Sequence, residues 1–255
     1  MNSQKDYMMK FLNSGTRFDG RKLEEYRKVS VEYGVSKNAE GSARVKIGKT
    51  EVLAGIKLSV GKPFPDTPND GVLMVGAELI PMSNPEFESG PPGIQAIELA
   101  RVIDRGIRES KAIDIRKLCI EKGEKVWLMS VDIVPVNDDG NLFDAAGLAT
   151  VAALKDTLFP KYDGVEINYK EKTKEGLPMS KEPISITVIK IGDKLLIDPT
   201  TDEEKMIEAR LTIASIKDKT ICALQKGGED PLTLEEIDQM VELGLKKAEE
   251  LHKLL

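Results

Sequence analysis

Histidine and cysteine are almost absent from this chain of 255 residues, which has one histidine, His252, and two cysteines. A single histidine excludes metal clusters built on histidine and argues against Ser-His-Asp or Cys-His catalysis. We expect Cys119 and Cys222, each inside an apolar strand-like run, to be buried reduced thiols rather than a disulfide or metal ligands. Any reaction would therefore depend on carboxylates, arginines or bound phosphate, and we expect no metal and no cofactor.

Long apolar runs are also lacking. None approaches the ~18 residues of a membrane-spanning helix, and the N-terminal stretch MNSQKDYMMKFLNSG has no apolar core of a secretion signal. We therefore expect a cytoplasmic protein. The net charge of −6 argues against a general basic surface for nucleic acid, but not against a local basic stripe inside a channel that another subunit completes.

The hydrophobic pattern predicts an α+β fold with helices packed on mixed or antiparallel sheets. Alternating apolar residues and turn signals indicate a first set of strands at 29–33, 43–47, 52–60, 72–80, 118–120 and 126–136, and a second set at 184–189, 194–197, 210–216 and 220–224. Helical spacing predicts helices at 5–15, 94–108 and 143–158, and a last one that begins at the Thr233–Glu236 capping box. Residues 170–182 are expected to form a polar loop or an irregular hairpin.

Three arginines share one face of the helix predicted at 94–108. Arg101, Arg105 and Arg108 are spaced four and three residues apart, and at about 100° per residue this spacing stacks them. A row of guanidinium groups on a rigid element suits a line of phosphates. Spacing alone favours a solvated face with the ion pairs Glu98–Arg101 and Asp104–Arg108, each contributing about 0.2–0.5 kcal/mol.

Other charged residues have ordinary structural interpretations. Arg17, Arg21 and Arg27 are expected to pair with Asp19, Glu24 and Glu25. Asp132, inside an apolar strand, is a candidate catalytic carboxylate, but a buried acid satisfied by a loop amide or an arginine is the more common case.

Several motifs in the right order resemble the ribonuclease PH superfamily. They are RFDGRKLEEYR at Arg17 to Arg27, the hairpin GSARVKIGKTEVLAGIK at Gly41 to Lys57, and SVDIVPVNDDGNLFDAAGLATVAAL at Ser130 to Leu154. The resemblance implies an RNase PH-like fold, also known as ribosomal protein S5 domain 2-like. It also implies an N-terminal helical extension at 1–15 and one domain at 16–255, with halves at about 16–160 and 183–255.

Catalytic members of this superfamily are phosphorolytic 3′→5′ exoribonucleases, and the chain departs from their pattern twice. Their adjacent phosphate-binding arginines fall on Ile94 and Gln95, which carry no charge. Their aspartate in a D-M-P-I-like segment falls on Lys181, with Glu182 next to it. A lysine cannot replace a carboxylate as metal ligand or proton acceptor, although a shift of one residue would recover Glu182. The two departures together imply a subunit without its own active centre.

Within the superfamily, PFPDTPNDG at Pro63 to Gly71, PEFESGPP at Pro85 to Pro92 and AIELARVIDR at Ala96 to Arg105 most resemble the non-catalytic ring subunit of the archaeal exosome. The resemblance implies a hexameric ring, a trimer of heterodimers with a catalytic RNase PH-type partner, capped by subunits with S1 or KH domains. It also implies that Arg101 and Arg105 contact RNA phosphates, and the stripe adds Arg108 as a candidate.

Two other functions remain open on the sequence. The first is an active phosphorolytic 3′→5′ exoribonuclease, with phosphate held by Arg101 or Arg105 and chemistry from Glu182 or Asp132. The second is a purely structural ring member that does not touch RNA.

Overall fold

The computed structural model describes residues 2–255, with side chains from residue 5 onward. Its larger sheet has the strand order β1-β2-β3-β6-β4, with β5 paired to β6. Neighbouring strands are antiparallel except β4 and β6, which run parallel. The strands of this sheet are β1 (Val29–Tyr33), β2 (Gly41–Ile47), β3 (Thr50–Gly61), β4 (Val72–Ala77), β5 (Cys119–Glu121) and β6 (Lys125–Asn137).

The expected strand at 72–80 ends early, at Ala77. Glu78 N–H still donates to Ile133 O, at 2.9 Å. To continue the parallel pairing, the N–H of residue 135 on β6 would have to donate to Glu78 O. Residue 135 is a proline and has no N–H. The chain therefore leaves the sheet here and enters the loop that precedes the next helix.

The smaller sheet is antiparallel, with the order β10-β9-β11-β12. It consists of β9 (Ile184–Ile191), β10 (Lys194–Ile197), β11 (Ala209–Ser215) and β12 (Ile221–Gly227). A separate hairpin pairs β7 (Leu158–Tyr162) with β8 (Ile167–Gly176). Part of the segment expected as a polar loop or irregular hairpin is thus a strand, with its pairing interrupted by register shifts.

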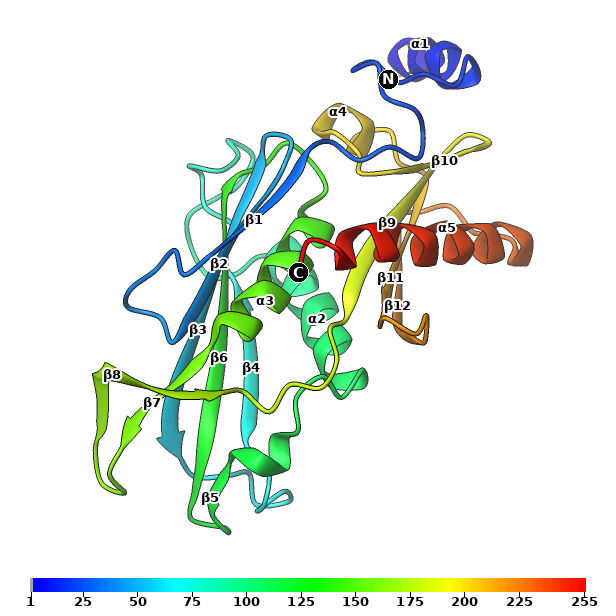
Figure 1. The fold of residues 1–255 in the computed structure, drawn as a ribbon. Coiled ribbons are helices and arrows are strands. Elements are labelled where there is room, and N and C mark those ends of the chain that lie inside the picture. The colour runs from blue at the N-terminus through cyan, green and yellow to red at the C-terminus, as the bar shows by residue number, and fades with distance from the viewer. Residues whose placement is uncertain (1) are drawn as a thin grey trace.

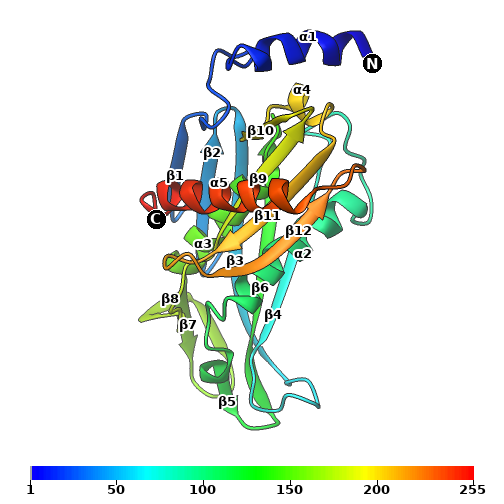
Figure 2. The ribbon, with the colours of Figure 1, turned by 90° about the vertical axis from the view of Figure 1, so that its right-hand side faces the viewer.

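The helices are α1 (Asn2–Asn13), α2 (Ile94–Glu109), α3 (Leu142–Asp156), α4 (Thr201–Glu204) and α5 (Leu234–His252), with a 3₁₀ turn at Ile115–Leu118. Helices α2 and α3 lie between the two sheets, and α5 covers the outer face of the smaller sheet (Figures 1 and 2). This arrangement confirms the expected α+β class. The capping box of Thr233 and Glu236 at the start of α5 is also confirmed.

Helix α3 is buried nearly all the way round because its side chains are small. Ala145, Ala149 and Ala152 have no exposed surface, and a Cβ on Gly147 would stand 3.3 Å from Ser185 Cβ. The short side chains let both sheets approach the helix closely. Helix α3 therefore fixes where the two sheets sit relative to each other.

Helix α1 packs on the smaller sheet through Met8 and Leu12, which cluster with Ile189, Ile191 and Leu196. Phe11 contacts Tyr7 and Phe18 edge to face beside this contact, and Tyr7 stacks on Phe18. Tyr7 is 56% exposed, so the aromatic residues of α1 form a side cluster rather than part of the buried face.

Candidate nucleic-acid interface

Helix α2 presents the three predicted arginines to solvent. Its opposite face buries apolar side chains between the sheets, among them Leu99, Val102, Ile103 and Ile107. Arg101, Arg105 and Arg108 lie on the remaining, exposed face. Ile97, one turn before Arg101, also lies there and is 48% exposed although it is apolar. The spacing of the arginines, four and three residues, keeps all of them away from the core.

The three arginines differ in what holds them. Arg108 donates from Nη2 to Asp104 Oδ1 at 2.7 Å and from Nε to Oδ2 at 3.1 Å, and Nη2 also reaches Leu73 O on β4 at 3.2 Å. The hydrogen bond to Asp104, together with its negative charge, raises the pKa of Arg108 above its usual value although burial acts against it. The expected Asp104–Arg108 pair is confirmed, and it neutralises this arginine.

Arg101 and Arg105 keep their charge available. Within residues 5–255, Arg105 Nη1 donates only to the neutral amide of Gln225 on β12, at 3.3 Å. Arg101 has no hydrogen-bond or ion-pair partner among residues 5–255. The expected Glu98–Arg101 pair does not form, because Glu98 Oε1 instead accepts from Arg210 Nη2 at 2.5 Å. The guanidinium of Arg210 also lies 4.6 Å from the ring centre of Phe143, which fixes it facing the first turn of α2.

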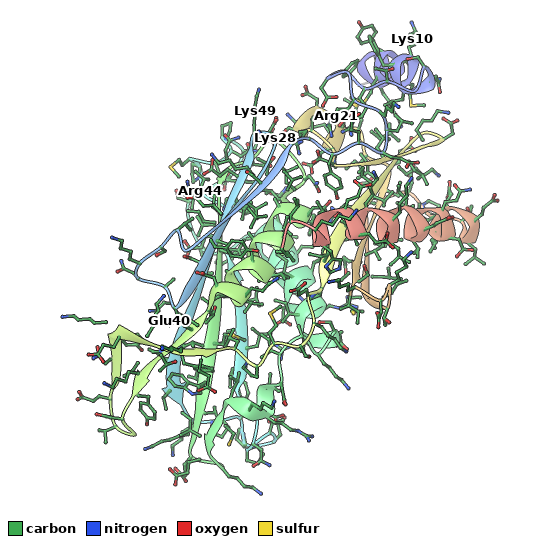
Figure 3. The ribbon with its side chains drawn as sticks, in the orientation of Figure 1. Lys10, Arg21, Lys28, Glu40, Arg44 and Lys49 are labelled. Atoms are coloured by element: carbon green, nitrogen blue, oxygen red, sulfur yellow. The ribbon has the colours of Figure 1, made fainter. Side chains whose placement is uncertain are left out.

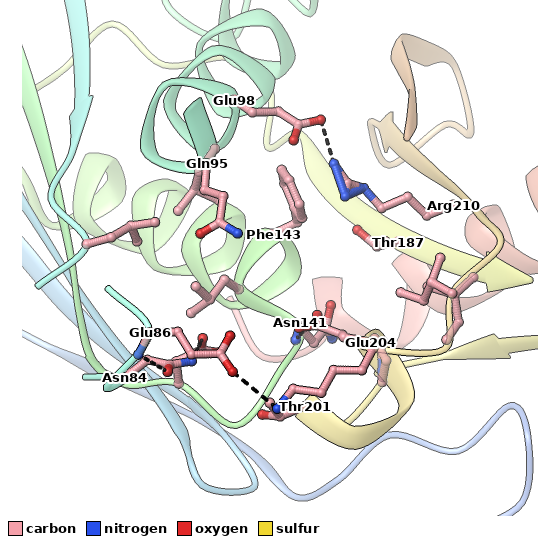
Figure 4. A pocket seen from close by; sticks show the side chains of 18 of the residues that line it. Asn84, Glu86, Gln95, Glu98, Asn141, Phe143, Thr187, Thr201, Glu204 and Arg210 are labelled. Atoms are coloured by element: carbon pink, nitrogen blue, oxygen red, sulfur yellow. Dashed lines mark hydrogen bonds and ion pairs between the residues drawn. The ribbon is translucent and has the colours of Figure 1, made fainter. Parts of the chain in front are cut away.

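The start of α2 carries none of the charge that would hold phosphate. Ile94 is 86% exposed, and Gln95 points into a pocket of about 380 Å³ at the first turns of α2 and α3 (Figure 4). The pocket is also lined from the loop before α2, from α4 and from the smaller sheet. Its polar and charged lining residues include Asn84, Glu86, Glu98, Asp138, Asn141, Thr187, Thr201, Glu204, Lys205 and Arg210.

Carboxylates dominate the electrostatics of this pocket. Glu86 pairs with Lys205 at 3.2 Å and Glu98 with Arg210, so both cations of the lining are already bound. Burial raises the pKa of Glu204 to about 7, and the charge of Asp138 adds to the rise, although Asn141 N–H acts against it. An anion placed here would face unneutralised acids, so the pocket is unsuited to phosphate.

The second departure from the catalytic pattern lies elsewhere. Lys181 and Glu182 line a different pocket, beyond the C-terminal end of α3, where Glu182 pairs with Lys155 at 2.6 Å. Asp132 is exposed on β6 and lines neither pocket. The expectation of a buried, satisfied Asp132 was therefore wrong, because alternate residues of β6 face outward. The structure does not gather Gln95, Asp132 and Glu182 into one site.

A network of buried and partly buried arginines and acids lies next to the pocket, at α4 and at the residue before α3. Arg17 is 1% exposed and binds Glu203 of α4, with a 2.8 Å bond from Nε to Oε1. Arg27 and Arg21 both bind Asp198, at 2.6 and 2.8 Å. Arg21 lies where the segment after α1 passes α4 (Figure 3). The expected Arg21–Asp19 pair forms at 2.7 Å, but the expected carboxylate partners Glu24 and Glu25 are wrong.

Sequence reasoning missed Asp198 and Glu203. The arginines lie on the segment after α1, about 180 residues from these acids, so no local pattern connects them. One signal was present, because Thr200 and Glu203 have the capping-box spacing and form that motif at α4. Asp198 also accepts from Asn141 Nδ2 at 2.9 Å, so the network positions Asn141, the residue that precedes α3, at the pocket.

Other predicted features have limited chemical use. Cys119 and Cys222 are free thiols but only partly buried, which corrects the expectation of full burial. Among the described residues, no group of three or more His, Cys, Asp or Glu side chains is arranged to hold a metal ion. No helix within residues 2–255 is long and apolar enough to cross a bilayer.

Comparison with known proteins places these features in context. The 3′ exoribonuclease family matches through its domain 1 at residues 25–160 and its domain 2 at residues 181–247. An exosome complex component Rrp42 from Methanocella arvoryzae is 46% identical over 252 residues, which cover 99% of this chain and 95% of that protein.

Solved structures agree with this match. A chain of the Archaeoglobus fulgidus exosome with RNA bound to the active site is 43% identical with a TM-score of 0.91, covering 99% of this chain and 97% of that one. A chain of an archaeal exosome core is 40% identical with a TM-score of 0.88, covering 99% and 96%. The RNase PH-like fold expected from the sequence is thereby confirmed.

Proposed function

The chain belongs to the 3′ exoribonuclease family, and from that premise we propose that it is a non-catalytic, RNA-contacting subunit of an archaeal exosome, a phosphate-dependent 3′→5′ exoribonuclease ring. The similar proteins are named as exosome components, and one of the similar structures is an exosome with RNA bound to its active site. In this proposal the chain supplies cations to the RNA and shapes the active site of a catalytic neighbour.

One observation carries the RNA-binding part of the proposal. Arg101 and Arg105 stand one turn apart on a helix anchored between two sheets, and neither is neutralised by an acid among residues 5–255. A spacing of four residues separates their positions by about 6 Å along the helix axis, which suits successive phosphates of an extended strand. Arg108 was a third candidate, but its ion pair with Asp104 favours a structural role for it.

The absence of catalysis by this chain alone rests on the pocket at the start of α2. Phosphorolysis needs a multiply charged phosphate to be held and its transition state stabilised by cations. This pocket offers the amide of Gln95 and two cations already paired with glutamates. At the other departure, Lys155 neutralises Glu182.

The partners follow from the same proposal. We infer a ring of alternating subunits, a trimer of heterodimers in which each copy of this chain sits beside a catalytic RNase PH-type subunit. Cap subunits with S1 or KH domains would guide RNA to the ring, and the complex would work in the cytoplasm. We also propose that residues 1–15 are an extension to one domain at 16–255, with halves at about 16–160 and 183–255.

A phosphate-dependent RNA decay assay tests the proposal. The purified chain alone is compared with the catalytic partner alone and with the reconstituted ring. We expect no nucleoside diphosphate from the chain alone and more from the ring than from the partner alone. Release by the chain alone, abolished by Glu182→Gln or Asp132→Asn, would instead establish an active enzyme. An assembled ring whose RNA binding is unchanged in Arg101→Ala, Arg105→Ala would establish a purely structural subunit.

A further inference from the structure

The pocket at the first turns of α2 and α3 has an excess of negative charge. Four carboxylates and two cations line it: Glu86, Glu98, Asp138, Glu204, Lys205 and Arg210. Because Lys205 is paired with Glu86 and Arg210 with Glu98, two carboxylates remain without a counter-ion. These are Asp138 and Glu204, and neither forms an ion pair with any residue from 5 to 255.

Neutral donors alone hold these two carboxylates. Asp138 accepts from Asn84 Nδ2 at 2.9 Å and from Gly140 N–H at 3.0 Å. Glu204 Oε1 accepts from Asn141 N–H at 2.8 Å, and its Oε2 has no donor among the described residues. Two acids that face one pocket without a cation leave a place for a positive ligand.

Asn141 supplies an independent sign of a missing donor. Its side chain is 1% exposed and lies beside Glu204 in the pocket wall (Figure 4). Its Nδ2 donates to Asp144 Oδ2 at 3.1 Å and to Asp198 Oδ1 at 2.9 Å. These bonds fix the orientation of the amide, so Oδ1 is an acceptor, and it has no partner within the described part of the chain. A buried acceptor without a donor is costly unless a ligand supplies one.

Apolar side chains make up a large part of the remaining wall. Leu79, Phe87, Leu99, Leu142 and Phe143 line the space next to the carboxylates. The volume of about 380 Å³ lies in the range of small-molecule sites, which are mostly apolar with a few placed polar groups. The lining therefore matches a ligand with a cationic head and an aliphatic stem, and it opposes an anion.

We propose that this pocket binds a small aliphatic amine, a diamine or polyamine, with one ammonium group held by Asp138, Glu204 and Asn141 and its methylene stem along the leucine and phenylalanine side chains. An ammonium has three N–H donors, one for each of these three acceptors. The proposal goes beyond the RNA-contacting role and does not depend on it.

Binding should depend on pH through Glu204. The charged groups around it are Asp138 before α3, Arg27 before β1, Arg210 on β11, and Lys205, Glu86 and Glu98 around the pocket. Because burial holds the pKa of Glu204 near 7 and an ammonium favours its ionised form, amine affinity rises with pH. Between pH 6 and pH 8 we expect a gain of roughly tenfold, with proton release on binding.

Isothermal titration of the full chain with putrescine and with spermidine tests the proposal. At pH 8 and low salt we expect saturable binding of one amine per chain, with a heat that changes with the ionisation enthalpy of the buffer near pH 7. Glu204→Gln should weaken binding at least tenfold and remove the buffer dependence. The glutamine can still accept from Asn141 N–H, so the fold is kept, and a melting curve checks this.

Asp138→Asn provides a second variant, since its Oδ1 can still accept from Gly140 N–H. The matched control is Asp218→Asn, which removes a carboxylate from the other pocket and should leave amine binding unchanged. Equal loss in all three variants would indicate a general charge effect and overturn the proposal. Non-saturable binding, or inorganic phosphate binding where the amines do not, would also overturn it.

Discussion

Arg108 holds Asp104 one turn earlier on α2 through two hydrogen bonds, 2.7 and 3.1 Å long, and reaches the backbone of β4 at Leu73. The same helix face carries Arg101 without a partner among residues 5–255. Of the three arginines in this row, Arg101 and Arg105 therefore have no acidic partner among residues 5–255, whereas Arg108 forms an ion pair within the helix. This difference separates residues available to RNA from a residue that ties α2 to the larger sheet.

Replacing Arg101 and Arg105 together with alanine should weaken RNA binding by the reconstituted ring about tenfold or more at low salt. Each free guanidinium that contacts a phosphate releases a counter-ion, so the slope of log K against log salt should fall by roughly 0.7 per arginine for a single strand. Filter binding or fluorescence anisotropy at several salt concentrations measures both quantities.

Arg116→Ala is the matched control for that experiment. Arg116 is also an arginine with a largely exposed side chain, but it lies in the 3₁₀ turn after α2, 4.0 Å from Asp70. Its removal should leave both affinity and salt slope unchanged. An equal fall in Arg116→Ala and in the double variant would mean that net charge, rather than the α2 face, determines RNA affinity.

Arg108→Ala should affect stability more than RNA binding. The variant loses the pair with Asp104 and the hydrogen bond to Leu73 O, and at a half-exposed site this amounts to about 0.5–1 kcal/mol. Urea unfolding should show this small decrease while RNA affinity stays within about twofold of the parent. A loss of affinity equal to that of the α2 double variant would place Arg108 in the RNA path after all.

Much of the fold was predictable because it follows from local periodicity. Val29 and Val31 alternate and mark the inward face of β1, and the small residues of α3 predict its burial on all sides. The structure follows both, but Tyr33, the next position of the alternation, is 39% exposed. Asp132 shows the limit of such reasoning. An acid within a hydrophobic strand is expected to be buried. Asp132 is exposed because one face of the sheet points outward at this position, and the strand sequence alone does not predict that.

The site was predictable only where one helix contains it. The spacing of Arg101, Arg105 and Arg108 indicated their common face, and the pair of Arg108 with Asp104 lies within the same helix. The contacts with Leu73 on β4 and Gln225 on β12 come from distant parts of the chain. Similarly, nothing near Glu98 predicts that Arg210 will bind it, and nothing near Arg17 predicts Glu203. Ion-pair partners depend on tertiary distances that hydrophobic pattern does not encode.

Removing one partner of the buried Arg17–Glu203 pair should strongly destabilise the fold. Arg17 also donates to the backbone oxygens of Ile197 and Asp198, at 2.8 and 2.7 Å. Arg17→Met leaves Glu203 buried without its cation, and such losses cost about 3–5 kcal/mol. Chemical unfolding of the purified chain measures the change.

The double variant Arg17→Met, Glu203→Met provides the control for that measurement. With neither charge left, the cost of an unpaired buried ion disappears, so the double variant should be more stable than Arg17→Met alone. Additive losses would show instead that Arg17 acts mainly through its backbone acceptors. The exposed Lys161–Glu171 pair, at 3.0 Å, should contribute less than about 1 kcal/mol in the same experiment.

Two carboxyls, Asp144 fully buried and Glu204 half-buried, give the protein an unusual pH response. Burial raises the pKa of Asp144 to about 7 although Tyr26, Thr187 and Asn141 donate to it, and burial likewise raises the pKa of Glu204 to about 7. The ordinary values are 3.8 and 4.5, so between about pH 4 and pH 7 the folded chain binds more protons than the unfolded chain. The stability that these groups contribute is complete below pH 4 and decreases as pH rises through 7.

Glu204→Gln should therefore flatten the decrease in stability between pH 5 and pH 8. A glutamine stays neutral at every pH and still accepts from Asn141 N–H, so the variant keeps the contact and loses the titration. The shift of Glu204 corresponds to at most about 3 kcal/mol, and Asp144 supplies the slope that remains. Asp198 does not offset this decrease in stability between pH 5 and pH 8. Burial raises the pKa of Asp198, but Arg27 lowers it by more, so the pKa lies below its usual value. The stability that ionised Asp198 contributes is therefore lost only in acid. Urea unfolding at pH 5, 6.5 and 8 distinguishes the outcomes, because an unchanged slope in Glu204→Gln would mean that Glu204 is already ionised in the folded chain at pH 5.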